Sequence, residues 1–105
     1  MKTWEIAFLP EADRDREQLE KSVRNQVDKA IRKVSQNPLP KSEGGYGNPL
    51  GHKQGRNLTG LLKIKLRKLG IRVVYDLIKE KETMRIIVVA VRADSEVYEI
   101  AEARK

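Results

Sequence analysis

The stretch LLKIKLRKLGIRVVYDLI, residues 61–78, decides the fold of this chain. Apolar and cationic residues alternate in its first half, and a β-strand places alternate side chains on opposite faces. The apolar face of the predicted strand 61–68 comprises Leu62, Ile64 and Leu66. Its other face comprises Lys63, Lys65 and Arg67. A short turn at residues 69–70 leads into a second predicted strand, residues 71–79, so we expect an antiparallel hairpin with one packed face and one cationic face.

The length of the turn sets which residues face each other across this hairpin. If the turn consists of residues 69–70 alone, Arg67 lies opposite Arg72. A three-residue turn would instead put Arg72 opposite Leu66, on the apolar face, where a charge is costly to bury. Burial therefore favours the two-residue turn. The predicted cationic face then comprises Lys63, Lys65, Arg67 and Arg72.

Regular elements are predicted on both sides of the hairpin. The alternation of residues 2–9 predicts a first strand, and two helices follow it. The second helix carries apolar residues at helical spacing. These are Val23, Val27, Ala30, Ile31 and Val34. With a further strand over residues 83–92 and a helix over residues 94–105, the sequence predicts an α+β fold: a mainly antiparallel four-stranded sheet, an N-terminal helical hairpin and a short C-terminal helix, in the order β-α-α-β-β-β-α.

Residues 38–60 lie between the helices and the hairpin, and they carry six of the seven glycines and three of the four prolines. Both residue types interrupt regular structure, so we expect a long surface loop here. A loop of this length is uncommon inside a compact domain. It is interpreted either as a functional loop beside a binding site or as a flexible spacer.

The composition indicates a small basic protein. With 105 residues the chain is expected to form a single domain, residues 1–105. Its 22 Lys and Arg against 15 Asp and Glu give a net charge of +7, which predicts a polyanionic partner such as RNA, DNA, a ribosome or an acidic protein. The absence of cysteine excludes disulfides and thiolate metal sites and fits a reducing compartment. No apolar run is long enough for a signal peptide or a membrane span, so a cytoplasmic protein is expected.

Several classes of enzyme site are excluded by residue type. His52 is the only histidine, so neither a histidine metal triad nor a two-histidine ribonuclease site is available. Gly44, Gly45 and Gly47 lack the preceding strand and following helix of a phosphate-binding fingerprint. The cationic face is the remaining candidate, because clustered cations repel each other and a bound phosphate offsets that cost. A solvated strand face is the alternative interpretation of the same pattern.

Four motifs resemble RelE-type toxins, in the wider RelE and ParE superfamily. The family's second helix is similar to SVRNQVDKAIRKVSQNP, residues 22–38. Its loop leading into a lysine-bearing strand is similar to NPLGHKQGRNLTGLLKIKL, residues 48–66. Its C-terminal half resembles the hairpin of residues 61–78 and the motif VRADSEVY, residues 91–98. The order and spacing of these motifs, over nearly the whole chain, make the resemblance specific.

The resemblance implies a RelE-like fold and the toxin component of a type II toxin-antitoxin system. It implies an endoribonuclease without metal or cofactor, which cleaves messenger RNA in the ribosomal A site and is held in check by an antitoxin protein. The implied catalytic residues are Lys63, Lys65, Arg72, Arg92 and Tyr98. The implied contacts to RNA or the ribosome are Lys53, Arg56 and Arg67.

In the implied reaction a ribose 2′-hydroxyl attacks the adjacent phosphodiester and leaves a 2′,3′-cyclic phosphate and a 5′-hydroxyl. Lys65, assisted by Lys63, would remove or electrostatically relieve the hydroxyl proton, and Arg72 would stabilise charge on the phosphate. Arg92 would stabilise the leaving oxygen. Tyr98 would stack on the scissile nucleotide or take part in proton transfer.

Two other functions stay open. A ParE-like chain would poison DNA gyrase and leave RNA intact. A noncatalytic RNA- or ribosome-binding module would depend on total charge and on salt rather than on individual residues. Structural roles also stay open for two of the implied residues: Tyr98 would pack the terminal helix, and Arg92 would pair with Asp94 or Glu96.

Overall fold

The computed structural model describes residues 3–53, 56–91 and 94–104, without the side chains of residues 52, 53, 56, 94 and 95. Its strands are β1 (Glu5–Phe8), β2 (Asn48–Lys53), β3 (Arg56–Leu66), β4 (Ile71–Ile78) and β5 (Thr83–Ala90). Its helices are α1 (Pro10–Glu17), α2 (Lys21–Ser35), α3 (Asp94–Arg104) and the short 3₁₀ helices η1 (Lys41–Glu43) and η2 (Lys79–Lys81). None of these helices is long and apolar enough to cross a membrane.

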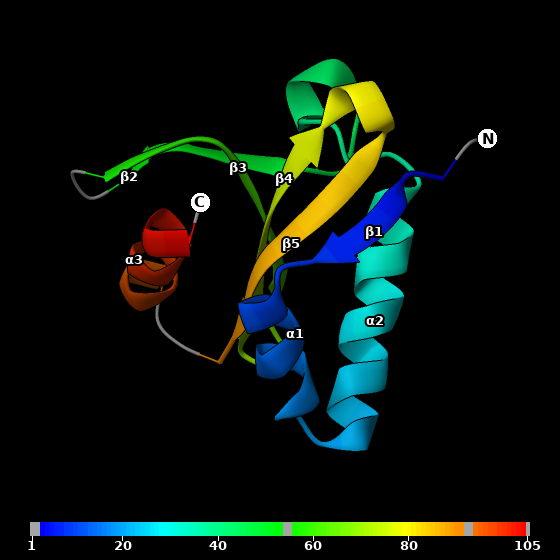
Figure 1. The fold of residues 1–105 in the computed structure, drawn as a ribbon, viewed down its shortest axis with the longest axis vertical. Helices are drawn as coiled ribbons and strands as arrows, with labels where there is room; N and C mark the ends of the chain where they lie inside the picture. The colour runs from blue at the N-terminus through cyan, green and yellow to red at the C-terminus, as the bar shows by residue number, and fades with distance from the viewer. Residues whose placement is uncertain (1–2, 54–55, 92–93, 105) are drawn as a thin grey trace.

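The five strands form one sheet in the order β1-β5-β4-β3-β2 (Figure 1). β1 pairs with β5 in parallel, and the other neighbours pair antiparallel. The α+β fold class is therefore confirmed, with the helical hairpin α1-α2 and the terminal helix α3 where the sequence predicts them.

The predicted four-stranded sheet is wrong by one strand. The expected loop 38–60 contains β2 and the beginning of β3, so the order is β-α-α-β-β-β-β-α. β2 lies at the edge of the sheet, where a proline that removes a ladder donor is tolerated. The register with β3 shifts between Pro49 and Gly51, and Gly51 adopts a φ of +57°, which glycine accepts readily. Pro49 and Gly51 thus belong to a bulged edge strand, whereas residues 38–47 connect α2 to β2 as a loop that contains η1.

The register of the β3-β4 hairpin differs by two residues from the prediction. Lys65, not Arg67, lies opposite Arg72. The reason is a longer turn: the Gly70 N–H donates to the carbonyl of Arg67, and Gly70 has a φ of +67°. Because the shift is an even number of residues, every side chain that stays in the two strands keeps its predicted face. Arg67 itself leaves the strand and lies in the turn.

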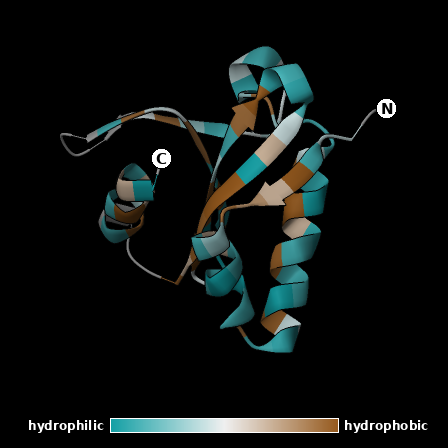
Figure 2. Ribbon diagram, viewed as in Figure 1, coloured by the Kyte–Doolittle hydropathy of each residue, from teal (hydrophilic) through white to brown (hydrophobic). Residues whose placement is uncertain are grey.

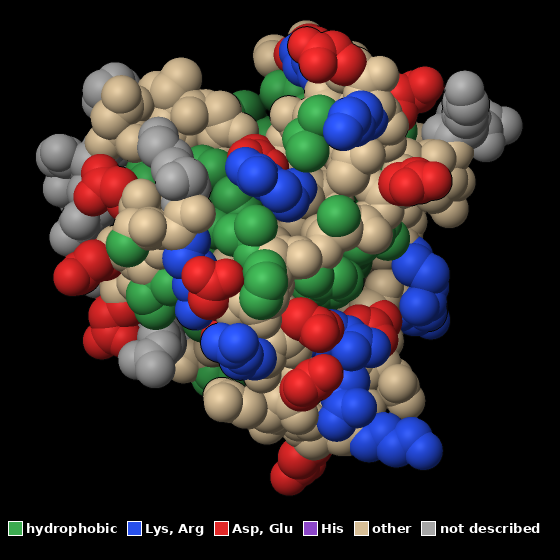
Figure 3. All heavy atoms as spheres, in the orientation of Figure 1, with side chains coloured by type: hydrophobic (Ala, Val, Ile, Leu, Met, Phe, Trp, Pro, Cys, Tyr) green, Lys and Arg blue, Asp and Glu red, His purple; other side chains and the backbone are tan. Residues whose placement is uncertain are grey.

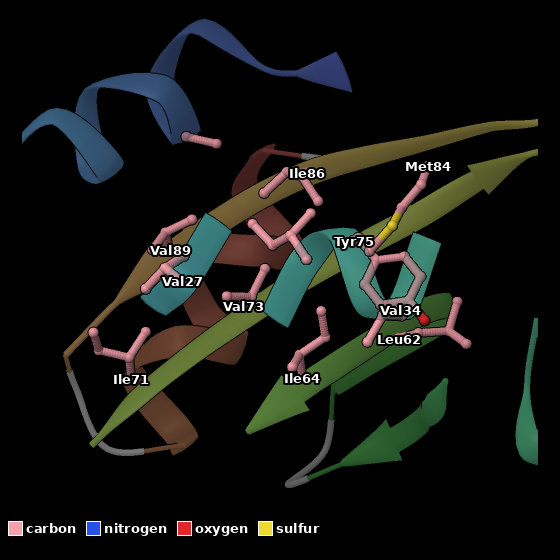
Figure 4. Packing of buried hydrophobic residues seen from close by; sticks show 12 residues of the cluster. Val27, Val34, Leu62, Ile64, Ile71, Val73, Tyr75, Met84, Ile86 and Val89 are labelled. Atoms are coloured by element: carbon pink, nitrogen blue, oxygen red, sulfur yellow. The ribbon is translucent and has the colours of Figure 1, made fainter. Parts of the chain in front are cut away.

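Two apolar clusters flank the sheet. Val73 and Val74, neighbours on β4, are both fully buried and belong to different clusters, because a strand alternates its faces. The first cluster packs against α1 and α2, and Figure 4 shows it from close by. The second cluster packs against α3, which lies apart from α1 and α2 on the other side of the sheet in Figure 1. The second cluster comprises Leu50, Leu58, Leu61, Val74, Ile87, Val88, Ala90, Val97, Tyr98 and Ala101.

The helical hairpin covers the first cluster mainly through α2. Its buried apolar residues recur one turn apart, as the hydrophobic bands along α2 in Figure 2 show. They are Val27, Ile31 and Val34. α1 is held to α2 by a bidentate pair, in which Arg16 Nε and Nη2 each donate to an Asp28 carboxylate oxygen at 2.6 Å. These hydrogen bonds raise the pKa of Arg16 and lower the pKa of Asp28.

β5 carries one extra residue opposite β4. Val74 lies opposite Val88. The next residue, Tyr75, lies opposite Ile86, so Ile87 is the inserted residue of a β-bulge. The bulge lets Ile87 and Val88, although consecutive, both enter the cluster under α3. It therefore shapes the surface on which the terminal helix packs.

Candidate functional site

Lys63 on β3 and Tyr98 on α3 meet on the α3 side of the sheet. Lys63 Nζ donates a 3.1 Å hydrogen bond to the Tyr98 hydroxyl and lies 5.8 Å from the centre of the Tyr98 ring. Tyr98 is 3% exposed, whereas Lys63 is half-buried. The packing of α3 on the second cluster thus brings a phenol next to an ammonium group.

Lys65 and Arg72 add two more cations to the same face. Lys65 follows Lys63 by two residues on β3, so their Cα atoms lie about 6.6 Å apart along the strand. Lys65 is exposed and lies opposite the half-buried Arg72 on β4. Like charges on directly opposed residues of a sheet are destabilising, and an anion between them offsets that cost. We call Lys63, Lys65, Arg72 and Tyr98 the cationic patch.

Among the described residues, the structure places no other implied site residue in the cationic patch. Arg67 lies in the β3-β4 turn and is exposed. Lys53 and Arg56 are paired residues of the β2-β3 hairpin, and their side chains lie outside the described part. Arg92 also lies outside the described residues, so its pairing with Asp94 or Glu96 stays a prediction.

The acidic residue of β4 is paired with an arginine of β5. Asp76 accepts two hydrogen bonds from Arg85 on β5, at 2.9 Å from Nε and 2.6 Å from Nη2. This pairing raises the pKa of Arg85. Among the described side chains of residues 3–51, 57–91 and 96–104, no three Asp or Glu are grouped as metal ligands. The patch thus combines three cations and one phenol on the α3 side of the sheet.

A second basic surface lies between α2 and the β3-β4 turn. We call it the basic groove. Its lining residues are Gln26, Lys29, Ala30, Arg32, Lys33, Gln36, Lys65, Leu66, Arg67, Lys68 and Leu69. Six of these are Lys or Arg and none is acidic. Figure 3 shows Lys and Arg side chains along the side of the molecule where α2 lies.

The contribution of α2 to this groove is absent from the sequence predictions. Lys29, Arg32 and Lys33 are exposed and lie three and four residues apart, the spacing at which helical side chains are neighbours. That spacing is visible in the sequence and could have indicated a basic face. The apolar residues of the same helix indicate only its buried face.

Comparisons with known proteins agree on one family. No protein-family model matches the chain. A RelE-like toxin protein of Escherichia coli is 28% identical over 102 residues, which cover 96% of each chain. The solved structure of a mutant E. coli toxin RelE in the free state has a TM-score of 0.77 and 31% identity, covering 98% of each chain. The same toxin in complex with an antitoxin RelBc peptide has a TM-score of 0.71 and 31% identity, covering 95% of each.

The likeness extends over nearly the full length of those structures and includes the sheet, the helical hairpin and the terminal helix. Sequence identity of 31% over this length, together with the shared fold, goes beyond a common architecture. The chain belongs to the RelE toxin family.

Proposed function

We propose that this toxin is an endoribonuclease that cleaves messenger RNA, in the ribosomal A site, through attack by a ribose 2′-hydroxyl. The observation that carries the proposal is the contact between Lys63 and Tyr98 beside the opposed pair Lys65 and Arg72. Four groups that bind phosphate or move protons, three on the sheet and one on α3, share the cationic patch. DNA lacks the 2′-hydroxyl nucleophile, so the substrate is RNA.

In this proposal each cation of the patch has its own role in phosphodiester cleavage. The 2′-hydroxyl loses its proton, its oxygen forms a bond to phosphorus, and the bond to the 5′-oxygen breaks. Lys65 assists removal of the proton, and the guanidinium of Arg72 stabilises charge on the phosphate oxygens. The products are a 2′,3′-cyclic phosphate and a 5′-hydroxyl, which takes up a proton.

Lys63 and Tyr98 act as a pair in this proposal. Lys63 donates to the phenol oxygen, so the hydroxyl hydrogen of Tyr98 is left to donate to a phosphate or leaving oxygen. Charge from Lys63 makes that donation stronger. Arg92, six residues before Tyr98, is proposed to stabilise charge on the leaving oxygen, because an arginine is a poor proton donor.

The proposed partners follow from the two basic surfaces. The ribosome and its message supply phosphates for the basic groove and for Lys53, Arg56 and Arg67. An antitoxin is proposed to inhibit the toxin by covering the cationic patch. A RelE toxin of similar structure has been solved with an antitoxin peptide, which supports a partner of this kind. The proposed compartment is the cytoplasm, where translating ribosomes are found.

The test is cleavage of a defined message on programmed ribosomes, with the new 5′-hydroxyl ends mapped. Lys65→Ala and Arg72→Ala are each expected to slow single-turnover cleavage about 100-fold. Arg72→Lys keeps the charge but loses the planar fork, so it is also expected to be impaired. Lys81→Ala, an exposed cation on η2, is the control and should cleave at the wild-type rate.

Each alternative function has its own result in this experiment. Intact message with unchanged ribosome binding would reject the nuclease and point to a noncatalytic module, as would equal effects of Arg72→Lys and Lys81→Ala. Inhibition of gyrase supercoiling with intact RNA would instead indicate the ParE-like activity. A parallel reaction on free RNA in EDTA tests whether cleavage needs a metal, since ribosomes themselves require magnesium.

A further inference from the structure

Two charged residues join the first helix to the last one at the bulge of β5. Asp15 lies on α1, and Arg104 is the last residue of α3. Arg104 Nη1 donates to Asp15 Oδ2 at 2.7 Å and to the carbonyl oxygen of Ile87 at 2.9 Å. The backbone N–H of Val89 donates to the same Asp15 oxygen at 3.2 Å. We call this set of contacts the Asp15-Arg104 clamp.

Both side chains of the clamp also form hydrogen bonds with the backbone of β5. β1 pairs with β5 as far as Ile86, and Asp15 and Arg104 bond to the backbone at Ile87 and Val89, just beyond. Both charged side chains are about four-fifths buried, with an exposed fraction of 20% for Arg104 and 23% for Asp15. Charge-assisted hydrogen bonds in such a setting are directional and stronger than neutral ones. The clamp therefore fixes one end of α3 relative to β5.

α3 connects the clamp to the cationic patch. Val97, Ala101 and Arg104 are spaced four and three residues apart and lie on one stripe of the helix. Val97 and Ala101 are fully buried but short, so their contacts resist sliding of the helix less than directional hydrogen bonds do. Tyr98 lies about 9 Å along the helix axis from Arg104. A shift at the clamp is transmitted to Tyr98 through one rigid helix.

We infer that Asp15 and Arg104 are positioning residues, which hold α3 so that the Tyr98 hydroxyl stays within hydrogen-bond reach of Lys63 Nζ. The kinetic part of this inference rests on the proposed nuclease function, and the structural part does not. A displacement of about 1 Å at a reacting group costs about 100-fold in rate. Removal of the clamp therefore acts on catalysis through Tyr98, although neither clamp residue belongs to the cationic patch.

The first arm of the test follows Tyr98 directly, by NMR of the full-length protein. In Arg104→Ala and in Asp15→Asn, the nuclear Overhauser contact between the Tyr98 ring and the Lys63 side chain is expected to weaken and the ring signals to shift. Arg104→Lys keeps the positive charge but lacks the planar guanidinium group, so it should retain part of the contact between Tyr98 and Lys63. The matched control is Arg16→Ala, which removes the ion pair between Arg16 of α1 and Asp28 of α2 and should leave the Tyr98 signals unchanged.

The second arm is a double-mutant cycle on single-turnover RNA cleavage. Arg104→Ala is expected to slow cleavage between about tenfold and 100-fold, with a change in KM within about twofold. In a Tyr98→Phe background the same substitution should cost less than about twofold, because the group it positions is already gone. Arg16→Ala should lower the unfolding temperature without this kinetic effect.

The outcomes test the positioning role of the clamp and the proposed nuclease function independently. Unchanged Tyr98 signals in both Arg104→Ala and Asp15→Asn would overturn the positioning role, whatever the activity. Additive effects of Arg104→Ala and Tyr98→Phe would overturn it as well, because the two residues would then act independently. A wild-type protein that cleaves no RNA would reject the proposed function, and the NMR comparison would still decide the clamp.

Discussion

The hydroxyl of Tyr75 donates a 2.9 Å hydrogen bond to the carbonyl oxygen of Pro38, and both residues are buried. This bond ties the middle of the sheet to the segment that leads into β2. Tyr75→Phe leaves a buried carbonyl without its donor, so we expect the free energy of unfolding to fall by about 1–3 kcal/mol. Urea denaturation measures the loss. Tyr46→Phe, on a tyrosine that is 48% exposed, is the control, and an equal loss in both variants would contradict the prediction.

The dependence of stability on pH should reveal the ionisation of the same tyrosine. Burial raises the pKa of Tyr75, so the folded chain keeps the phenol proton at a pH where the unfolded chain has lost it. Its stabilising contribution is fully present below about pH 10 and is lost as the pH rises further, by up to about 1.4 kcal/mol per pH unit. The stability difference between wild type and Tyr75→Phe should therefore shrink above about pH 10. A constant difference across that range would rule this out.

Acid should weaken the helical hairpin through Asp28. The hydrogen bonds from Arg16 lower the pKa of this carboxyl, so its contribution is present above the unfolded pKa of about 4 and is lost as the pH falls through the lower folded value. Asp28→Asn is expected to cost about 1 kcal/mol at neutral pH, and the cost should fade in acid. Thermal unfolding across the pH range measures this. Asn25→Ala, on an exposed residue of α2 that does not titrate, should show no such trend.

The basic groove should govern docking rather than chemistry. The triple substitution Lys29→Ala, Arg32→Ala and Lys33→Ala removes the α2 side of the groove. The slope of log affinity against log salt should fall by about one for each phosphate that the variant no longer binds. Cleavage of ribosome-bound message at saturation should stay within about twofold of wild type. If the salt dependence of ribosome binding is the same for this variant as for wild type, the basic groove is not part of the ribosome interface.

Period-two alternation made the cationic face predictable. The spacing of Lys63 and Lys65 with Leu62 and Ile64 assigns both lysines to one face, and the structure keeps that assignment although the pairing register differs. The error in register arises because turn length depends on backbone hydrogen bonds after Leu66, which residue types alone do not specify. An even shift is the smallest change that burial allows, since an odd one would expose the apolar face.

Contacts between distant elements were not predictable from local patterns. The resemblance named Tyr98 together with Lys63, but only the packing of α3 on the bulged surface of β5 shows that their side chains meet. The pairing of Asp15 with Arg104 had no sequence signal, because helices rich in charge offer many combinations of opposite sign. β2 was missed for a different reason: glycine and proline lower strand propensity, and an edge position tolerates them.

The parallel pairing of β1 with β5 has a consequence for how this toxin is made. Glu5 of β1 lies opposite Thr83 of β5, so β1 cannot pair during synthesis until β5 has left the ribosome. α3, which carries Tyr98, emerges later still. A nascent chain cut short before that point lacks both the closed sheet and the contact to Lys63. The sheet and the Lys63–Tyr98 contact are therefore completed only when nearly the whole chain has been synthesised.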